Sequence, residues 1–172
     1  MPIVPETKSW TWVLERACPE CGFDASSVAY QDIPRLTRAN AARWPEVLRR
    51  DDVRLRPNDD TWSALEYAAH VRDVFRVFRG RLTRMLDEDD PAFENWDQDA
   101  AAVAGRYDQQ DPSTVSAELV EAADAIADAF AQVPDDALGR TGRRSDGAVF
   151  TVTTLARYFI HDPVHHLWDV RG

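Results

Sequence analysis

The chain has 172 residues, of which 44% are hydrophobic and 29% are charged, and this composition fits one globular domain with its own core. Its formal net charge of −10 disfavours binding to nucleic acid and to acidic membrane surfaces, and no apolar run approaches the ~20 residues of a membrane span. The first residues, MPIVPETKSW, lack the basic and apolar regions of a targeting signal, so we expect a cytoplasmic protein.

Residues 1–30 are predicted to form an irregular N-terminal extension that carries the chain's two cysteines, Cys18 and Cys21, in CPECGFD. This spacing is found in half a zinc site and in redox pairs. A four-ligand zinc site would need two further ligands, such as a remote histidine or carboxylate, because no other cysteine exists. A disulfide is a further alternative. The simplest interpretation is a tight turn that ends at Gly22 and carries two thiols without a shared role.

Residues 31–172 carry the helical patterns. The first helix is predicted to start at Asp32, and Pro45 should kink it or start a new helix there. The second helix is the clearest, with a cap expected within residues 59–61 and apolar residues at helical spacing as far as Leu86.

The second half of the chain alternates between loops and helices. Residues 91–112 are predicted to be a loop with a short helical turn, and the third helix should start at Ser113 or Thr114. Residues 133–147 form a turn-rich connection, and 150–153 could be a short strand or a cap. The last helix is predicted over about 153–170. Four long helices predict an all-α four-helix bundle with long crossover connections.

Three of the four histidines lie within residues 161–166, as HDPVHH. An α-helix turns about 100° per residue, which places His166 inside the apolar arc of the last helix and Asp162 at its edge. His161 and His165 fall toward the opposite side. An i, i+4 pair lies on one helix face, as two metal ligands from one helix must.

The fourth histidine, His70, falls at the margin of the apolar arc of the second helix, a position that suits a residue lining a cleft. His70, Asp162 and His166 would supply two imidazoles and a carboxylate, which suit Zn²⁺ or Ni²⁺ and leave a position open. His161 and His165 form an alternative pair at the same spacing. From periodicity alone, solvated or hydrogen-bonded histidines are the simpler interpretation.

Two segments, TWSALEYAAHVRDV and TLARYFIHDPVHHLWDV, resemble the DinB-like superfamily of four-helix bundles, and the resemblance extends over residues 32–170. Family members carry a W-S-x-x-E-x-x-x-H segment on the second helix, represented here by Trp62, Ser63, Glu66 and His70. The N-terminal extension with CPECGFD, called the lead-in below, stays outside this resemblance.

The resemblance implies that the His70 position and an i, i+4 pair on the last helix are metal ligands. The later member corresponds to His166, and its partner position holds Asp162. A carboxylate there, and the H-x-x-D pattern from His166 to Asp169, resemble the mycothiol-dependent maleylpyruvate isomerase branch. HDPVHH has one residue more between His161 and the His doublet than the commonest family pattern.

The implied function is that of a divalent-metal-dependent S-transferase or isomerase, related to bacillithiol S-transferases, with a low-molecular-weight thiol as co-substrate and a small electrophile as substrate. Arg140, Arg143 or Arg144 could bind a carboxylate on either molecule. The alternative is a non-catalytic, stress-related bundle without metal that binds a small ligand or forms a homodimer through an exposed Trp168 and Val164.

Overall fold

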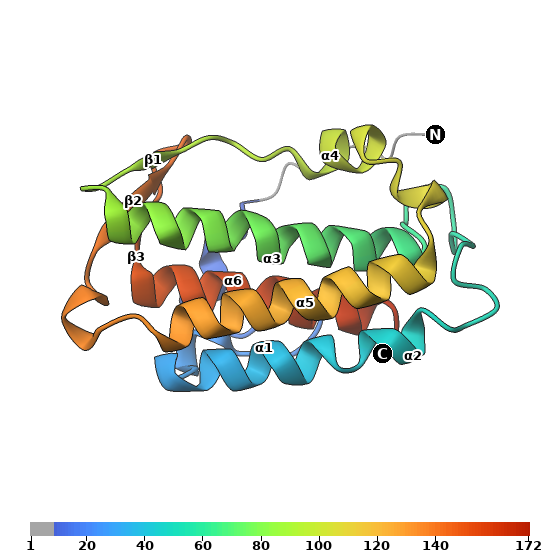
Figure 1. The fold of residues 1–172 in the computed structure, drawn as a ribbon, viewed down its shortest axis with the longest axis horizontal. Coiled ribbons are helices and arrows are strands. Elements are labelled where there is room, and N and C mark those ends of the chain that lie inside the picture. Colours follow the sequence, from blue (N-terminus) through green and yellow to red (C-terminus); the bar gives the residue numbers. More distant parts are fainter. Residues whose placement is uncertain (1–8) are drawn as a thin grey trace.

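The computed structural model of the chain describes residues 9–172, so the first eight residues of the predicted extension lie outside the described part. Its long helices form a four-helix bundle (Figure 1). They are α1 (Ile33–Ala41), α3 (Ala64–Asp87), α5 (Pro112–Ala131) and α6 (Val152–Asp169), and two short helices are α2 (Trp44–Val47) and α4 (Gln98–Ala104). Among the described residues, no helix has both the length and the apolar character that a membrane crossing requires.

The bundle contains one connection that runs its full length. Helices α3 and α5 contact each other and run in the same direction (Figure 1), so the chain between them must return along the bundle. This crossover contains β1 (Ala92–Phe93), α4 and the 3-10 helix η4 (Tyr107–Gln109). Helix α6 contacts both α1 and α3. The predicted all-α bundle with a long crossover is therefore confirmed.

A small sheet closes one end of the bundle. Strand β2 (Thr141–Arg144) pairs in parallel with β1 and antiparallel with β3 (Val149–Thr151). A Cβ atom at Gly142 would lie 2.5 Å from Cζ of Phe93 and 2.9 Å from Cγ of Met85, so the sheet can approach α3 only because this residue is glycine. The sequence indicated only the strand near residue 150, because β1 has two residues and β2 (TGRR) has, apart from Thr141, none of the β-branched and aromatic residues that mark a strand.

Helix α3 starts later than the sequence predicted. Its N-cap is Ser63, outside residues 59–61, and it forms a capping box. The Ser63 Oγ accepts a hydrogen bond from the Glu66 backbone N–H at 3.3 Å, and Glu66 Oε2 accepts one from the Ser63 N–H at 2.8 Å. The predicted cap was wrong because residues 59–61 belong to a preceding turn, in which Asn58 and Thr61 form a bridge.

The other two long C-terminal helices also begin with a side-chain cap. Helix α5 starts at Pro112, because Asp111 accepts a hydrogen bond from the Thr114 N–H at 2.8 Å; the predicted start at Ser113 or Thr114 was late. Helix α6 starts at Val152 with Thr151 as its cap, so the segment near residue 150 is both strand and cap.

Aromatic rings fill the centre of the bundle. Phe159 of α6 contacts Phe75 and Phe78 of α3 at ring-centroid distances of 5.8 and 5.5 Å, and Phe130 of α5 at 5.4 Å. Since Phe159 touches two neighbouring helices, it fixes the position of α6 in the bundle.

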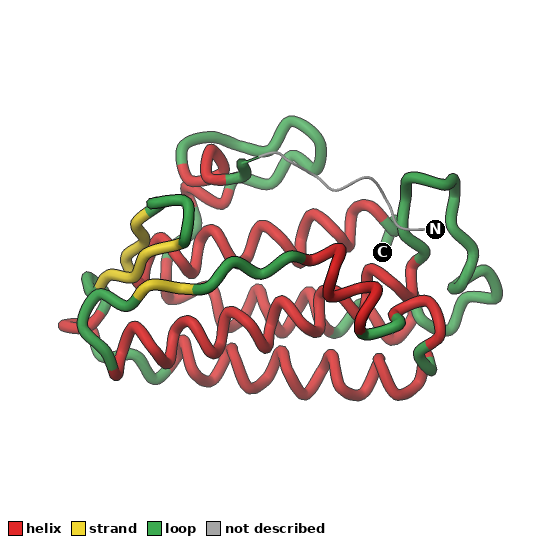
Figure 2. The backbone as a smooth tube through the Cα atoms, turned by 90° about the horizontal axis from the view of Figure 1, so that it is seen from above, coloured by secondary structure: helices red, strands yellow, loops and turns green. Residues whose placement is uncertain are grey.

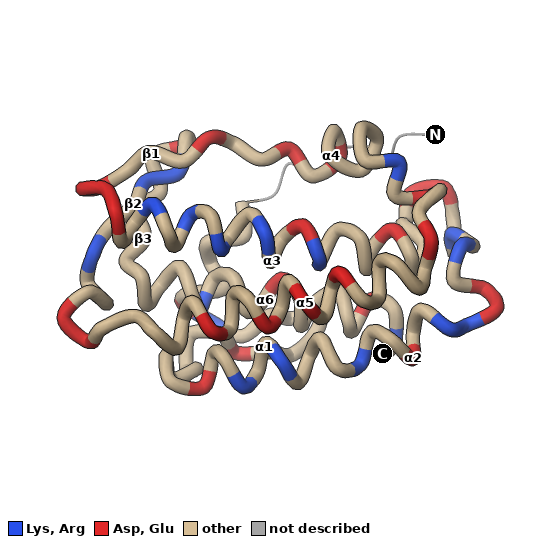
Figure 3. The backbone as a smooth tube through the Cα atoms, viewed as in Figure 1, with Lys and Arg blue, Asp and Glu red and all other residues tan. Residues whose placement is uncertain are grey.

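Lys and Arg positions on α1 and α3 lie next to Asp and Glu positions on α5 (Figure 3). On one side Arg38 of α1 pairs with Asp124 at 3.2 Å and also with Asp128 of α5. Most of these pairs are exposed, so they contribute little to the free energy of folding and instead favour one helix arrangement.

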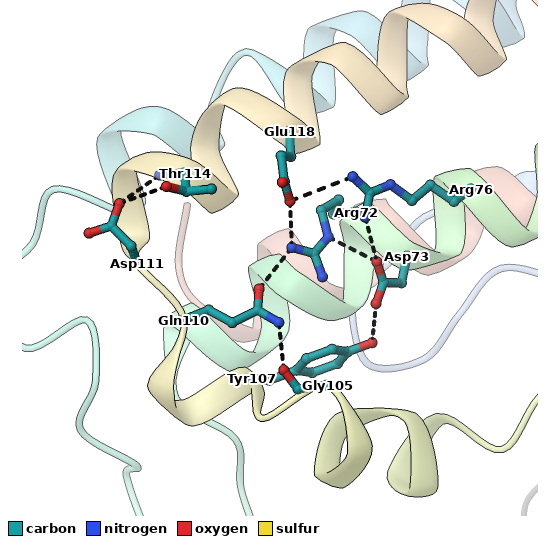
Figure 4. A network of polar contacts seen from close by, with 9 residues as sticks. All are labelled: Arg72, Asp73, Arg76, Gly105, Tyr107, Gln110, Asp111, Thr114 and Glu118. Atoms are coloured by element: carbon teal, nitrogen blue, oxygen red, sulfur yellow. Dashed lines mark hydrogen bonds and ion pairs between the residues drawn. The ribbon is translucent and has the colours of Figure 1, made fainter.

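One polar network, centred on the buried Arg72, lies between α3, α5 and the crossover (Figure 4). Arg72, which is 6% exposed, donates at 2.8 Å to Glu118, to Gln110 and to Asp73. The Tyr107 hydroxyl donates to the second oxygen of Asp73 at 2.5 Å. The network fastens the end of the crossover to α3.

The segment before the bundle contains three 3-10 helices, η1 (Thr11–Leu14), η2 (Ala25–Ser27) and η3 (Tyr30–Asp32). All three contact α6. Figure 2 shows this segment, which continues from the grey trace, lying outside the layer of long helices. It therefore covers a face of α6 that would otherwise be exposed.

Candidate metal centres

The contact between α3 and α6 brings His70, Asp162 and His166 together. One ligand atom of each residue lies within 4.8 Å of the other two. The Asp162 Oδ1 is 3.4 Å from His70 Nε2 and 3.7 Å from His166 Nε2. The two imidazole rings meet edge to face, with centroids 4.8 Å apart. Three side chains predicted as one ligand set therefore converge on one point.

Several buried polar atoms of this group have no hydrogen-bond partner within residues 9–172. They are both ring nitrogens of His70 and the Oδ1 of Asp162, and the 3.4 Å approach of His70 Nε2 to this oxygen is a charge contact without hydrogen-bond geometry. A buried polar atom without a partner costs about 1–3 kcal/mol, so proteins rarely retain several at one place without a ligand. The two imidazoles and the carboxylate match the donor set of a divalent cation. The residues present therefore fit a metal ion.

His166 is oriented by a second carboxylate. Its Nδ1 lies 2.8 Å from the Asp169 Oδ2, one turn later on α6. Because the Asp169 carboxylate accepts a hydrogen bond from Nδ1–H, the neutral His166 ring carries its lone pair on Nε2, the nitrogen that faces Asp162. Carboxylates that fix the tautomer of a metal-binding histidine in this way are common in metal sites.

Asp162 is charged over the whole physiological range. Burial alone would raise its pKa, but the imidazoles of His166 and His70 lower the pKa to about 2. The carboxylate can therefore act as an anionic ligand without first losing a proton.

Aromatic rings enclose His70. Trp96, from the crossover, stacks on its ring at 5.4 Å and 11°, and Trp62 contacts it at 5.3 Å. Tyr67 lies 5.0 Å from the His166 ring. The sequence placed His70 at the edge of a cleft, whereas these rings bury it completely.

A cavity of about 620 Å³ opens beside this group. Its lining includes the side chains Asp162, His166, Trp96, Tyr158, Arg81 and Arg144. The volume is in the range of sites that hold a small molecule. The wall also carries acidic side chains, and Arg144 is paired with one of them, Asp146, at 2.5 Å. Among the described residues, Arg81 is therefore the cavity-lining cation that is left to meet an anionic group of a ligand.

The three arginines named from the sequence have different surroundings. Arg140 donates at 2.7 Å to two main-chain carbonyls at the end of α3, and Arg143 pairs with Asp90 at 2.6 Å. Only Arg144 lines the cavity, where its Nη1 donates to the Tyr158 hydroxyl at 3.0 Å.

Arg81 is a cavity residue that was not among the predicted site residues. Its guanidinium lies 5.1 Å from the Phe78 ring and 5.5 Å from the Phe93 ring, and burial lowers its pKa. Arg81 follows His70 by three helical turns on α3, which is the signal that could have identified it. No sequence pattern could have placed Trp96 in the cavity wall, because this residue comes from the crossover rather than from a helix of the site.

A second group joins the lead-in to α6. The Sγ atoms of Cys18 and Cys21 and one ring nitrogen each of His161 and His165 lie within 4.8 Å of one another. Cys18 Sγ is 3.6 Å from His165 Nδ1, and Cys21 Sγ is 3.8 Å from His161 Nε2. Both cysteines are free thiols.

These two histidines were expected on the side of the last helix away from its apolar arc. They do lie with the lead-in rather than with His70, but they are only 4% and 8% exposed. Burial is the main cause that lowers the pKa of His161 to about 4 and also lowers that of His165. Burial likewise raises the pKa of Cys21 to about 11. A helical wheel could not show this, because a different segment covers the face.

The surface pair expected on α6 is only partly present. Trp168 is 50% exposed, whereas Val164 is half-buried and packs against the core. Val164 was therefore wrongly expected to be exposed, because the wheel ignored the neighbouring segments.

Comparison with known proteins gives a family and a fold. A sequence model described as the DinB superfamily matches residues 35–170. The solved structure of YfiT from Bacillus subtilis, described as a probable metal-dependent hydrolase with an unusual four-helix bundle topology, superposes with a TM-score of 0.69. The match has 18% identity and covers 98% of this chain and 93% of YfiT, so it shows the fold. No curated protein matches the chain.

Proposed function

Because the chain belongs to the DinB superfamily, we propose that it is a metal-dependent enzyme in which His70, Asp162 and His166 bind one divalent cation beside the cavity. The observation that carries this proposal is the convergence of buried polar atoms of His70 and Asp162 that have no hydrogen-bond partner in the described chain.

The donor set defines the class of ion. Two neutral imidazoles and one carboxylate suit Zn²⁺ or Ni²⁺, and three protein ligands leave at least one coordination position for a substrate atom. The position next to the cavity gives a small molecule access to that atom.

We propose transfer or isomerisation with a low-molecular-weight thiol as the reaction. A bound divalent cation would supply Lewis acidity that favours the thiolate form of such a thiol. The chain contributes orientation and binding. Asp169 holds the Nδ1 proton of His166, and Trp96 shields His70 from water. Arg81 provides positive charge for a carboxylate on the thiol or on the electrophile, whereas the charge of Arg144 is balanced by Asp146.

Hydrolysis is the second candidate. It is favoured by the structural similarity to YfiT, which is described as a probable metal-dependent hydrolase. The same ligand set could serve either reaction, since the difference lies in whether a thiol or water is the nucleophile.

The first test is the metal content of protein purified without a histidine tag, compared between the wild type, His166→Ala and Trp168→Ala. Trp168 is the control, because it lies on the same helix, is half exposed and has its ring against His165 rather than against one of the three proposed ligands. We expect His166→Ala to lose one equivalent of cation while the control keeps it. Equal metal content in all three folded proteins, even after addition of Zn²⁺ or Ni²⁺, would contradict the proposal.

The second test separates the two reactions. Metal-loaded protein is incubated with electrophiles and esters, with and without a panel of low-molecular-weight thiols. Product that forms only with a thiol supports the transferase, and product that forms without one supports the hydrolase. A folded, metal-free protein that merely binds ligands or dimerises would favour the non-catalytic alternative.

A further inference from the structure

We propose that Cys18, Cys21, His161 and His165 form a second metal site, a closed structural Zn²⁺ site that fastens the N-terminal segment to α6. It uses none of the three residues assigned to the cavity centre, and it would exist whether or not that centre binds a cation.

The distances fit tetrahedral zinc. With Zn–S near 2.3 Å and Zn–N near 2.0–2.1 Å, tetrahedral angles put sulfur and nitrogen about 3.6 Å apart. The two closest cysteine–histidine pairs are 3.6 and 3.8 Å apart, and all four ligand atoms lie within 4.8 Å. An ion could therefore enter with little movement of the side chains.

The backbone around the cysteines is shaped to present both thiols together. The Cys18 N–H donates to the Phe23 carbonyl and the Gly22 N–H to the Cys18 carbonyl, both at 2.9 Å. Gly22 has φ of +74°, a left-handed conformation that favours glycine and closes the turn. The tight turn predicted from CPECGFD is therefore present, and it brings the two sulfurs to one side.

The histidines are one turn apart on α6 and so reach the same point. The Nδ1 of His165 faces Cys18, while its Nε2 lies 3.8 Å from carboxylate oxygens of Glu20 and Asp169. Acceptors near the outer nitrogen are the usual arrangement around a zinc-binding histidine, because they favour the lone pair on the nitrogen that faces the metal.

The site is closed, which favours a structural role. Four protein ligands complete a tetrahedral shell and leave no position for substrate. Trp10 covers both imidazoles, with ring centroids 5.4 Å from His161 and 5.2 Å from His165. Cys18, His161 and His165 are buried and Cys21 is half-buried. The two histidines also form part of the cavity wall, so the site is closed by its four ligands rather than by distance from the cavity.

The proposed ion would cross-link segments that are more than a hundred residues apart in the sequence. On binding, each thiol loses its proton to solvent and its sulfur bonds to the cation, with no change in oxidation state. Since the site forms only in the folded chain, its binding free energy adds to folding stability. It would also fix the turn of α6 that carries Asp162 and His166.

Cobalt is the probe for this site, because bound thiolates give a sulfur-to-cobalt charge-transfer absorption that imidazole and carboxylate ligands do not. Reduced full-length protein is depleted of metal and titrated with Co²⁺. We expect the charge-transfer band in the wild type and in His166→Ala, and its loss in the double variant Cys18→Ser/Cys21→Ser. Persistence of the band in His166→Ala would separate this site from the cavity centre.

A second measurement needs no variant that might fail to fold. The reactivity of the two thiols is followed in wild-type protein loaded with Zn²⁺, before and after addition of a chelator. We expect slow reaction before chelation and at least tenfold faster reaction afterwards, together with a lower melting temperature. Absence of the cobalt band in the reduced wild type, or thiol reactivity that zinc does not change, would overturn the proposal and leave a redox pair.

Discussion

At the scale of single residues, His166 shows how a neighbour defines a ligand. Helical spacing placed Asp162 and His166 on one face, and the structure adds the hydrogen bond between His166 Nδ1 and Asp169 at 2.8 Å. Without that acceptor the imidazole could rotate or hold its proton on the nitrogen that faces Asp162. Asp169 should therefore act on the metal indirectly, through the orientation of His166.

Asp169→Asn tests this role. Loss of such an outer carboxylate typically weakens metal binding by about 10–100-fold, and we expect this change at the cavity centre. The dissociation constant is measured by competition with a chromophoric chelator. The cobalt–thiolate band reports the other site in the same samples, because Asp169 also lies 3.8 Å from His165. Unchanged affinity at the cavity centre would show that Asp169 does not orient His166.

At the scale of elements, the start of α3 depends on Ser63 and Glu66 rather than on the acidic turn before them. The capping box satisfies backbone N–H groups that the first turn of a helix leaves unpaired. Because α3 carries both His70 and Arg81, the position of this cap sets where the helix presents the site.

Ser63→Ala should lower the free energy of unfolding by about 1 kcal/mol, because the helix loses its cap. Thr61→Ala is the control, since Thr61 was a predicted cap that the structure places outside the helix. We expect a change within about 0.5 kcal/mol there. Urea denaturation measures both, and similar losses in the two variants would show that the box does not stabilise α3.

Glu66 makes the stability of α3 dependent on pH. Burial would raise its pKa, but hydrogen bonds from Arg56 and Ser63 lower the pKa below the ordinary value of 4.5. The charge therefore stabilises the fold above the unfolded-state pKa, and this contribution disappears as the pH falls through the folded-state pKa. Glu66→Gln keeps a capping side chain without the charge. Its urea midpoint should fall less steeply than that of the wild type below about pH 5, and parallel curves would exclude the effect.

At the scale of the whole molecule, Phe159 and the lead-in hold α6 from opposite sides. The ring packs against α3 and α5, while the lead-in covers the other face. The α6 ligands of both candidate metal groups lie in the turns that follow Phe159, and one of the groups includes two cysteines of the lead-in. The bundle and the lead-in together therefore determine the geometry of these groups.

Phe159→Ala should cost about 3–5 kcal/mol of unfolding free energy, because it leaves a cavity where three helices meet. Trp168→Ala on the same helix removes a half-exposed ring and should cost much less. Urea denaturation with an unchanged m-value checks both. A small loss at Phe159 would mean that the surrounding rings can collapse into the space.

The sequence by itself determined the helices and the ligand candidates on them, because helical periodicity and i, i+4 spacing are local properties. The wheel therefore separated Asp162 and His166 from His161 and His165. The N-cap of α3 was harder to predict, because several polar residues before Ser63 are also suitable caps. Only tertiary structure decided what each face of α6 meets. Trp96 buries His70 from the crossover, and Cys18 reaches His165 from the far end of the chain. Such contacts depend on how distant segments pack, and no local pattern encodes that packing.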